Sequence, residues 1–130
     1  MCLIPNNKVK IPYSRSKEYF IGYKLLIKGF NAPLTPYVYQ QGWNEPDFPD
    51  NTKERLHSYE RGFLHVFLTK KAAELFRCNK QQIVVPVRCH YEDVAAIGFM
   101  DDSDEFPQVA MRKLFITKVN YNKAAKYLLP

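Results

Sequence analysis

A histidine, His65, lies in the most apolar stretch of the chain, GFLHVFL over residues 62–68. Histidine titrates near neutral pH and is therefore the side chain most often used for general acid–base catalysis. Because side chains alternate along a strand, His65 would share one face with Phe63 and Phe67. No carboxylate lies at a spacing that would pair with it. We therefore expect a buried, neutral, hydrogen-bonded ring, with a catalytic role as the alternative.

Metal-binding residue types are present but scattered. Of the three cysteines and three histidines, only Cys89 and His90 are adjacent, and neighbours on a strand point to opposite faces. The acidic segment 101–105 lacks the alternation and the glycine of a calcium loop, and the five glycines are too far apart for a phosphate loop. We expect no metal and no cofactor. The odd number of cysteines favours a reducing compartment.

Charge and aromatic content favour a binding role. The net charge is +6 and aromatic residues make up 15% of the chain. Basic and aromatic residues interleave over 10–20 and again over 70–80, a pattern that suits a phosphate backbone and stacked bases. A basic surface that only keeps the protein soluble is the alternative. The candidate binding residues are Lys8, Lys10, Arg15, Lys17, Tyr39, Trp43, Lys70, Lys71 and Arg77.

The hydrophobic pattern predicts the elements that must position these residues. Strands are expected over 19–29, 62–68, 93–100 and 107–119, with a shorter edge strand within 31–40. The segment 81–90 also alternates, but Pro86 cannot donate to a ladder and indicates an edge strand or a bulge. Thr69 and Asn120 are suitable N-caps for two helices.

This pattern is typical of an α+β fold, with a mainly antiparallel sheet of five to six strands and one or two helices packed on one face. The 130 residues fit one domain, 19–130, preceded by an extended basic arm over 1–18. The long loop at 40–61 contains a short helix predicted over 52–60. Without a signal peptide or a membrane span, we expect a cytoplasmic protein with no membrane partner.

Several segments resemble a known group of proteins. The chain begins MCL and continues with YFIGYKLL, TPY, GFLHVF and IVVPVRC, followed by DVAAIG. Together they resemble an uncharacterised family of small phage and gut-bacterial proteins, from which the chain departs by Leu64, inserted between Gly-Phe and His. The resemblance implies a mobile-element origin. For a phage-encoded protein, we expect a host protein or nucleoprotein complex as partner, in the host cytoplasm.

The order of expected elements over residues 62–119, a strand and a helix followed by further strands, is similar to that in the C-terminal half of ADP-ribosyltransferase folds. In that family a glutamate before a late strand orients the substrate nucleophile, and Glu105 occupies this position. The family also holds NAD with a histidine or arginine in its first strand, where this chain has Tyr23 and Lys24. The resemblance implies a degenerate nucleotide-binding fold, or an enzyme that uses Tyr23, His65 and Glu105.

We therefore expect a small non-enzymatic phage-type binding protein, an inhibitor or modulator of a host nucleic-acid-handling or defence component. Its ligand would be a host protein or nucleoprotein, nucleic acid or a nucleotide. An ADP-ribosyltransferase-like nucleotide-binding protein or enzyme is the first alternative. A virion or assembly component, which self-associates through its edge strands, is the second.

Overall fold

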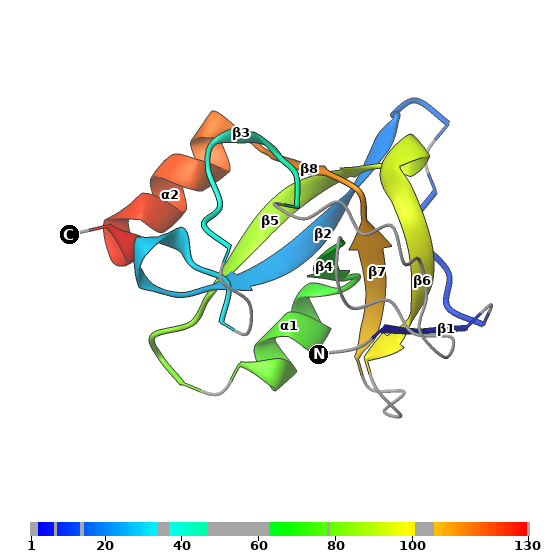
Figure 1. Ribbon diagram of the computed structural model, residues 1–130, viewed down its shortest axis with the longest axis horizontal. Coiled ribbons are helices and arrows are strands. Elements are labelled where there is room, and N and C mark those ends of the chain that lie inside the picture. Colours follow the sequence, from blue (N-terminus) through cyan, green and yellow to red (C-terminus); the bar gives the residue numbers. More distant parts are fainter. Residues whose placement is uncertain are drawn as a thin grey trace.

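The fold is a single curled antiparallel sheet with two helices (Figure 1). The computed structural model describes residues 3–6, 8–13, 15–33, 37–46, 63–77, 79–100 and 106–129. The strands are β1 Leu3–Pro5, β2 Tyr19–Leu26, β3 Gly42–Asn44, β4 Leu64–Phe67, β5 Ile83–His90, β6 Val94–Met100, β7 Pro107–Met111 and β8 Leu114–Ile116. The helices are α1 Lys70–Phe76 and α2 Lys118–Leu128, with 3-10 turns η1 Lys28–Phe30 and η2 Tyr91–Asp93.

The strand order is β1–β6–β7–β4–β2–β5–β8–β3, and every pairing is antiparallel. The predicted α+β class is confirmed, with eight strands instead of five or six. The additional strands are β1 and β3 at the two edges, which have no long hydrophobic run to predict them, and β8, which the strand predicted over 107–119 included; the strand predicted within 31–40 does not form.

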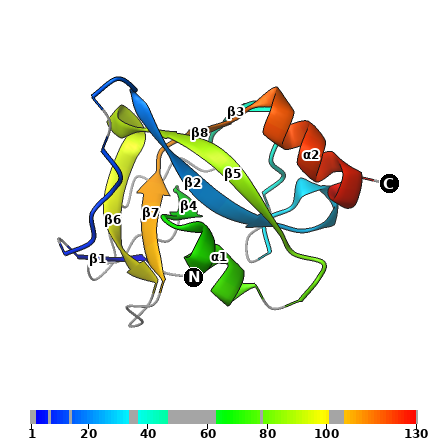
Figure 2. The ribbon, with the colours of Figure 1, turned by 180° about the vertical axis from the view of Figure 1, so that it is seen from behind.

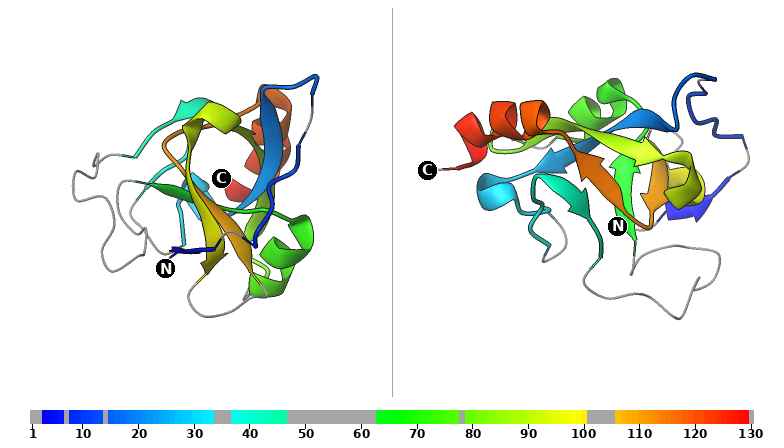
Figure 3. Two further views of the ribbon diagram at one scale, coloured as in Figure 1. Left: turned by 90° about the vertical axis from the view of Figure 1, so that its right-hand side faces the viewer. Right: turned by 90° about the horizontal axis from the view of Figure 1, so that it is seen from above.

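The main core lies on the inner face of the curl, which Figure 3 shows end on. Alternate residues of β2 and β5 point inward, among them Phe20, Leu26 and Val85. Gly22 allows β2 to approach β4 closely, because a Cβ at this position would overlap Val66 Cγ1. Burial of this apolar surface is the main force that holds the sheet in its curled form.

The two helices pack against different clusters of side chains. Helix α1 buries Ala72 and Ala73 against Leu25 and Phe67, on the outer face of the sheet (Figure 2). Helix α2 follows β8 and contributes Ala124 and Leu128 to the main core instead. The predicted packing of the helices on one face therefore describes α1, whereas α2 closes the inner core.

Thr69 caps α1 as predicted, since its hydroxyl accepts a hydrogen bond from the Ala72 amide at 3.0 Å. The cap of α2 was predicted at Asn120 but is Thr117, whose hydroxyl accepts from the Asn120 amide at 3.2 Å. The long strand predicted over 107–119 is likewise divided into β7, β8 and the first turn of α2.

Pro86 was expected to mark an edge strand or a bulge, yet β5 lies between β2 and β8 in a continuous register. Strand β8 pairs with β5 at Arg88 and ends at Ile116. At Pro86, β5 has passed the end of β8, so no residue of β8 lies opposite the proline. The Pro86 nitrogen can face this unpaired side without the loss of a ladder hydrogen bond.

The basic arm predicted over 1–18 is anchored, because β1 pairs with β6 and Val9 is buried in the main core. The predicted strand within 31–40 is reduced to isolated bridges at Asn31 and Val38. The helix predicted over 52–60 and the acidic segment 101–105 lie outside the described residues.

Candidate nucleic-acid interface

The outer face of β2 and β5 is divided into a covered half and an open half. Helix α1 packs on the half that carries Leu25 and Val84. The other half lies beyond α1, and its exposed surface includes Ile21, which is 37% exposed. This open half continues onto the neighbouring strands β8 and β3, because Arg88 of β5 pairs with Phe115 and Phe115 pairs with Trp43.

Four aromatic rings form a continuous row across these strands. The centroid of His90 lies 5.5 Å from that of Tyr19 and 5.0 Å from that of Trp43. The Trp43 ring in turn contacts Phe115 edge-on at 5.2 Å. One ring comes from each of β2, β5, β3 and β8, so the row depends on the strand order rather than on any local motif.

Three cations lie over the same rings. The guanidinium of Arg88 is 4.6 Å from the centroid of Tyr19 and 5.9 Å from that of Phe115. The ammonium of Lys113 is 4.7 Å from the Trp43 ring, and that of Lys17 is 5.7 Å from the Tyr19 ring. We call this surface the aromatic–basic face; its residues are Lys17, Tyr19, Trp43, Arg88, His90, Lys113 and Phe115.

Charge on the aromatic–basic face is unbalanced. Over the described part of the chain, the ion pair that forms is on α1, between Lys70 and Glu74 at 3.9 Å. Among the described residues, the three cations of the face therefore contact ring faces and form no ion pair with a carboxylate. Such an arrangement leaves positive charge available to an anionic ligand.

The position of Trp43 is fixed by the residue that follows it. Asn44 is fully buried, and its amide accepts a hydrogen bond from the Gln40 N–H at 2.8 Å and donates to the Gln40 carbonyl at 2.9 Å. The Gln40 side chain donates to the Trp43 carbonyl at 3.1 Å. Gly42 has φ +91°, a conformation that favours glycine, and directs the chain into β3. Trp43 consequently remains 43% exposed although its backbone is held.

The predicted binding residues occupy several places. Lys17 and Trp43 belong to the aromatic–basic face. Tyr39 is 2% exposed, so burial removes it from any binding surface. Arg77 donates to the backbone carbonyls of Asn79 and Lys80. The remaining predicted residues are exposed elsewhere, namely Lys8, Lys10, Arg15, Lys70 and Lys71.

Sequence reasoning missed Tyr19, Arg88, His90, Lys113 and Phe115. One signal was present: Arg88 and His90 alternate with the inward-facing Val87 and Cys89, which indicates an outward face. Which strands would extend that face could not be derived from the local pattern.

The residues considered for catalysis do not form an open site. His65 is 7% exposed, and neither ring nitrogen has a hydrogen-bond partner within the described ranges, contrary to the hydrogen-bonded ring expected. Burial lowers the pKa of His65 to about 3, with the nearby Lys24 charge acting in the same direction. Tyr23 lies in the cluster under α1, and Glu105 lies outside the described residues. A neutral, enclosed imidazole is not accessible to a substrate.

No family model, curated protein or solved structure matches the chain. Across the described ranges, His, Cys, Asp and Glu side chains do not come together in threes as metal ligands would. Neither α1 nor α2 combines the length and the apolar character that a membrane crossing requires. The geometry of the aromatic–basic face is thus the feature on which a functional argument can be built.

Proposed function

We propose that this chain is a non-enzymatic binding protein whose aromatic–basic face holds a single-stranded nucleic acid. The observation that carries the proposal is the row of four rings across β2, β5, β8 and β3, with three cations lying over it. Bases present flat π-faces to rings of this kind, and phosphates attract the cations.

The same geometry favours a single strand over a duplex. A base must be unpaired and unstacked before an aromatic side chain can stack on it. The rings belong to a sheet surface and not to a projecting helix, so they are poorly shaped to enter the major groove of a duplex. Sequence specificity is expected to be low, since stacking and phosphate contacts tolerate every base.

We further propose that this binding serves to modulate a host nucleic-acid-handling or defence component in the cytoplasm. The support is the resemblance to small phage proteins together with the rings and cations of the face, which are complementary to a nucleic acid. A nucleoprotein complex would present both a protein and an exposed strand to the aromatic–basic face.

Binding can be measured through the single tryptophan of the chain. A base that stacks on Trp43 should quench its emission during a titration with a twelve-nucleotide oligothymidine. We expect saturable quenching with this strand and little with a duplex of the same length. Anisotropy of a labelled strand provides a second readout for variants that lack the tryptophan.

Substitution of one ring should weaken binding by about 5- to 150-fold, because stacking contributes about 1–3 kcal/mol per base. Suitable variants are Trp43→Leu and Phe115→Leu. Lys126→Gln is the control, since Lys126 is exposed on α2, away from the face, and this variant should bind like the parent protein. Equal affinity of Trp43→Leu, Phe115→Leu and the parent protein for the single strand would overturn the proposal.

A further inference from the structure

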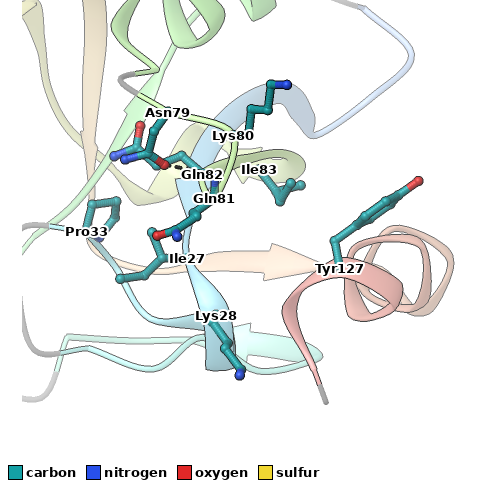
Figure 4. A pocket seen from close by; sticks show the side chains of 9 residues that line it. All are labelled: Ile27, Lys28, Pro33, Asn79, Lys80, Gln81, Gln82, Ile83 and Tyr127. Atoms are coloured by element: carbon teal, nitrogen blue, oxygen red, sulfur yellow. Dashed lines mark hydrogen bonds between the residues drawn. The ribbon is translucent and has the colours of Figure 1, made fainter.

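A pocket of about 620 Å³ lies at the opposite end of β5 from the aromatic–basic face (Figure 4). It is formed where β2 ends and β5 begins, next to α2. Ile83 and His90 mark the two ends of β5, about 24 Å apart at about 3.4 Å per residue. The pocket is lined by Ile27, Lys28, Pro33, Asn79, Lys80, Gln81, Gln82, Ile83 and Tyr127.

The amide-rich wall of the pocket is held in place by backbone hydrogen bonds. Arg77 donates to the carbonyls of Asn79 and Lys80, at 3.0 and 3.3 Å. The Asn79 side chain accepts from the Gln81 amide at 2.8 Å, and its carbonyl accepts from the Gln82 amide at 3.3 Å. The loop that presents these side chains is therefore ordered before any ligand arrives.

The opposite wall is the ring of Tyr127, which is 72% exposed. Figure 4 shows Tyr127 on one side, Asn79, Gln81 and Gln82 grouped on the other, and Ile83 between them. An exposed aromatic ring next to an apolar floor is a common feature of ligand pockets. A flat ligand can contact the ring and the isoleucine while its edge meets the Gln81 amide.

The chemistry of the lining indicates which ligand fits. The exposed side-chain amide of Gln81 offers a donor and an acceptor side by side, as the edge of a nucleobase requires. Lys28 and Lys80 supply positive charge, and none of the nine lining residues carries a carboxylate. The pocket thus combines an apolar floor, an amide that can pair with a base edge, and positive charge for an anion. The volume of the pocket lies in the range that is typical of small-molecule binding sites.

We propose that this pocket binds a nucleoside monophosphate, with the base between Tyr127 and Ile83 and the phosphate near Lys80. The site is separate from the aromatic–basic face and does not depend on the proposed single-strand binding. It gives the chain a second, mononucleotide ligand.

Calorimetric titration with AMP, GMP, CMP and UMP tests the proposal. We expect saturable binding of at least one of them, at one site per chain. The matching nucleoside and ribose 5-phosphate, which each lack half of the ligand, should both bind at least tenfold more weakly. Lys80→Gln should weaken nucleotide binding about tenfold through loss of a charged contact, and Tyr127→Leu should weaken it similarly.

Two controls separate this site from the rest of the molecule. Lys126→Gln removes one positive charge, as Lys80→Gln does. Lys126 lies on α2 next to Tyr127 but does not line the pocket, so this variant should leave the affinity for the nucleotide unchanged. Trp43→Leu should also leave it unchanged, whatever its effect on single strands. Absence of saturable binding by all four nucleotides overturns the proposal, as does an equal loss of affinity in Lys80→Gln and Lys126→Gln.

Discussion

Lys24 is a cation inside the curled sheet. Its ammonium donates a hydrogen bond to the His65 carbonyl at 2.7 Å and lies 5.3 Å from the centroid of the buried Tyr39 ring. Burial lowers the pKa of Lys24 from 10.5 to about 8, while the nearby Cys89 acts in the opposite direction. At pH 7 the side chain is still protonated, so the core contains a charge stabilised by a carbonyl dipole and a ring face.

The pKa of Lys24 predicts a rise in stability above neutral pH. Because the unfolded chain retains this proton up to pH 10.5 and the folded one releases it near pH 8, unfolding takes up a proton between these values. We expect the free energy of unfolding to increase by about 1 kcal/mol from pH 7 to pH 9 on account of Lys24. Lys24→Met should remove this increase in urea unfolding, whereas Lys126→Met should retain it.

Titration of Cys89 sets the highest pH at which the effect of Lys24 on stability can be measured separately. Burial raises the pKa of its thiol from 9 to about 12, so its contribution to stability decreases as the pH rises through this range. The difference between Lys24→Met and the parent protein is therefore measured below pH 9. An equal pH dependence in both proteins would contradict the assignment.

The pKa of His65 predicts how stability changes below neutral pH. Its pKa of about 3 in the folded protein, against 6.5 when exposed, means that unfolding takes up a proton between these values. Stability should therefore fall by about 2 kcal/mol from pH 7 to pH 5 through His65 alone. We expect His65→Leu, which keeps the apolar packing, to show a flatter profile over this interval. If the parent and His65→Leu lose stability in parallel, the imidazole is not the group responsible.

At the scale of the elements, β3 is a three-residue edge strand whose geometry depends on one buried amide. Asn44 hydrogen-bonds the Gln40 backbone in both directions and the Gly42 carbonyl at 3.2 Å. These contacts hold the segment before Trp43, in addition to the pairing of β3 with β8. The exposed ring is thus positioned by a side chain on the other face of its own strand.

Asn44→Ala should loosen β3, because it leaves buried backbone groups without partners at a cost of about 1–3 kcal/mol. We expect stronger acrylamide quenching of Trp43 emission and weaker single-strand binding, although every residue of the aromatic–basic face is retained. Gln41→Ala, at an exposed position of the same loop, is the control. Quenching that is the same in Asn44→Ala and Gln41→Ala would show that Asn44 does not position the ring.

The elements that the sequence predicted are those with a strong local signal. The apolar run around His65 and the threonine cap of α1 both form as expected. Pro86 misled, because its effect depends on where β8 ends, and Asn120 misled because Thr117 offers a cap one turn earlier. Local pattern specifies an element, whereas its ends and neighbours depend on contacts distant in sequence.

The aromatic–basic face shows the same limit. Tyr19, Trp43, Arg88 and Phe115 are far apart in the chain and meet only because β2, β5, β8 and β3 are neighbours in the sheet. Lys17 and Trp43 could be selected by residue type alone. Arg88 and His90 alternate with buried residues, so their outward direction was predictable, but the rings that they would contact were not.

At the scale of the whole molecule, the net charge of +6 attracts any polyanion, so affinity alone does not locate a binding site. Two of the groups of surface cations differ in what surrounds them. One is the aromatic–basic face, with Arg88, Lys113 and Lys17. The other is the start of α1, with Lys70 and Lys71, where Lys70 is already paired with Glu74.

The salt dependence of single-strand binding distinguishes the two groups. Each phosphate contact adds about −0.7 to the slope of log affinity against log salt, so three cations on the face give a slope of about −2. We expect Arg88→Gln with Lys113→Gln to reduce its magnitude by about 1.4, and Lys70→Gln with Lys71→Gln to reduce it by less than half as much. Both double variants lose two charges, so net charge is matched between them. A larger reduction in the α1 variant would move the site from the aromatic–basic face to the helix.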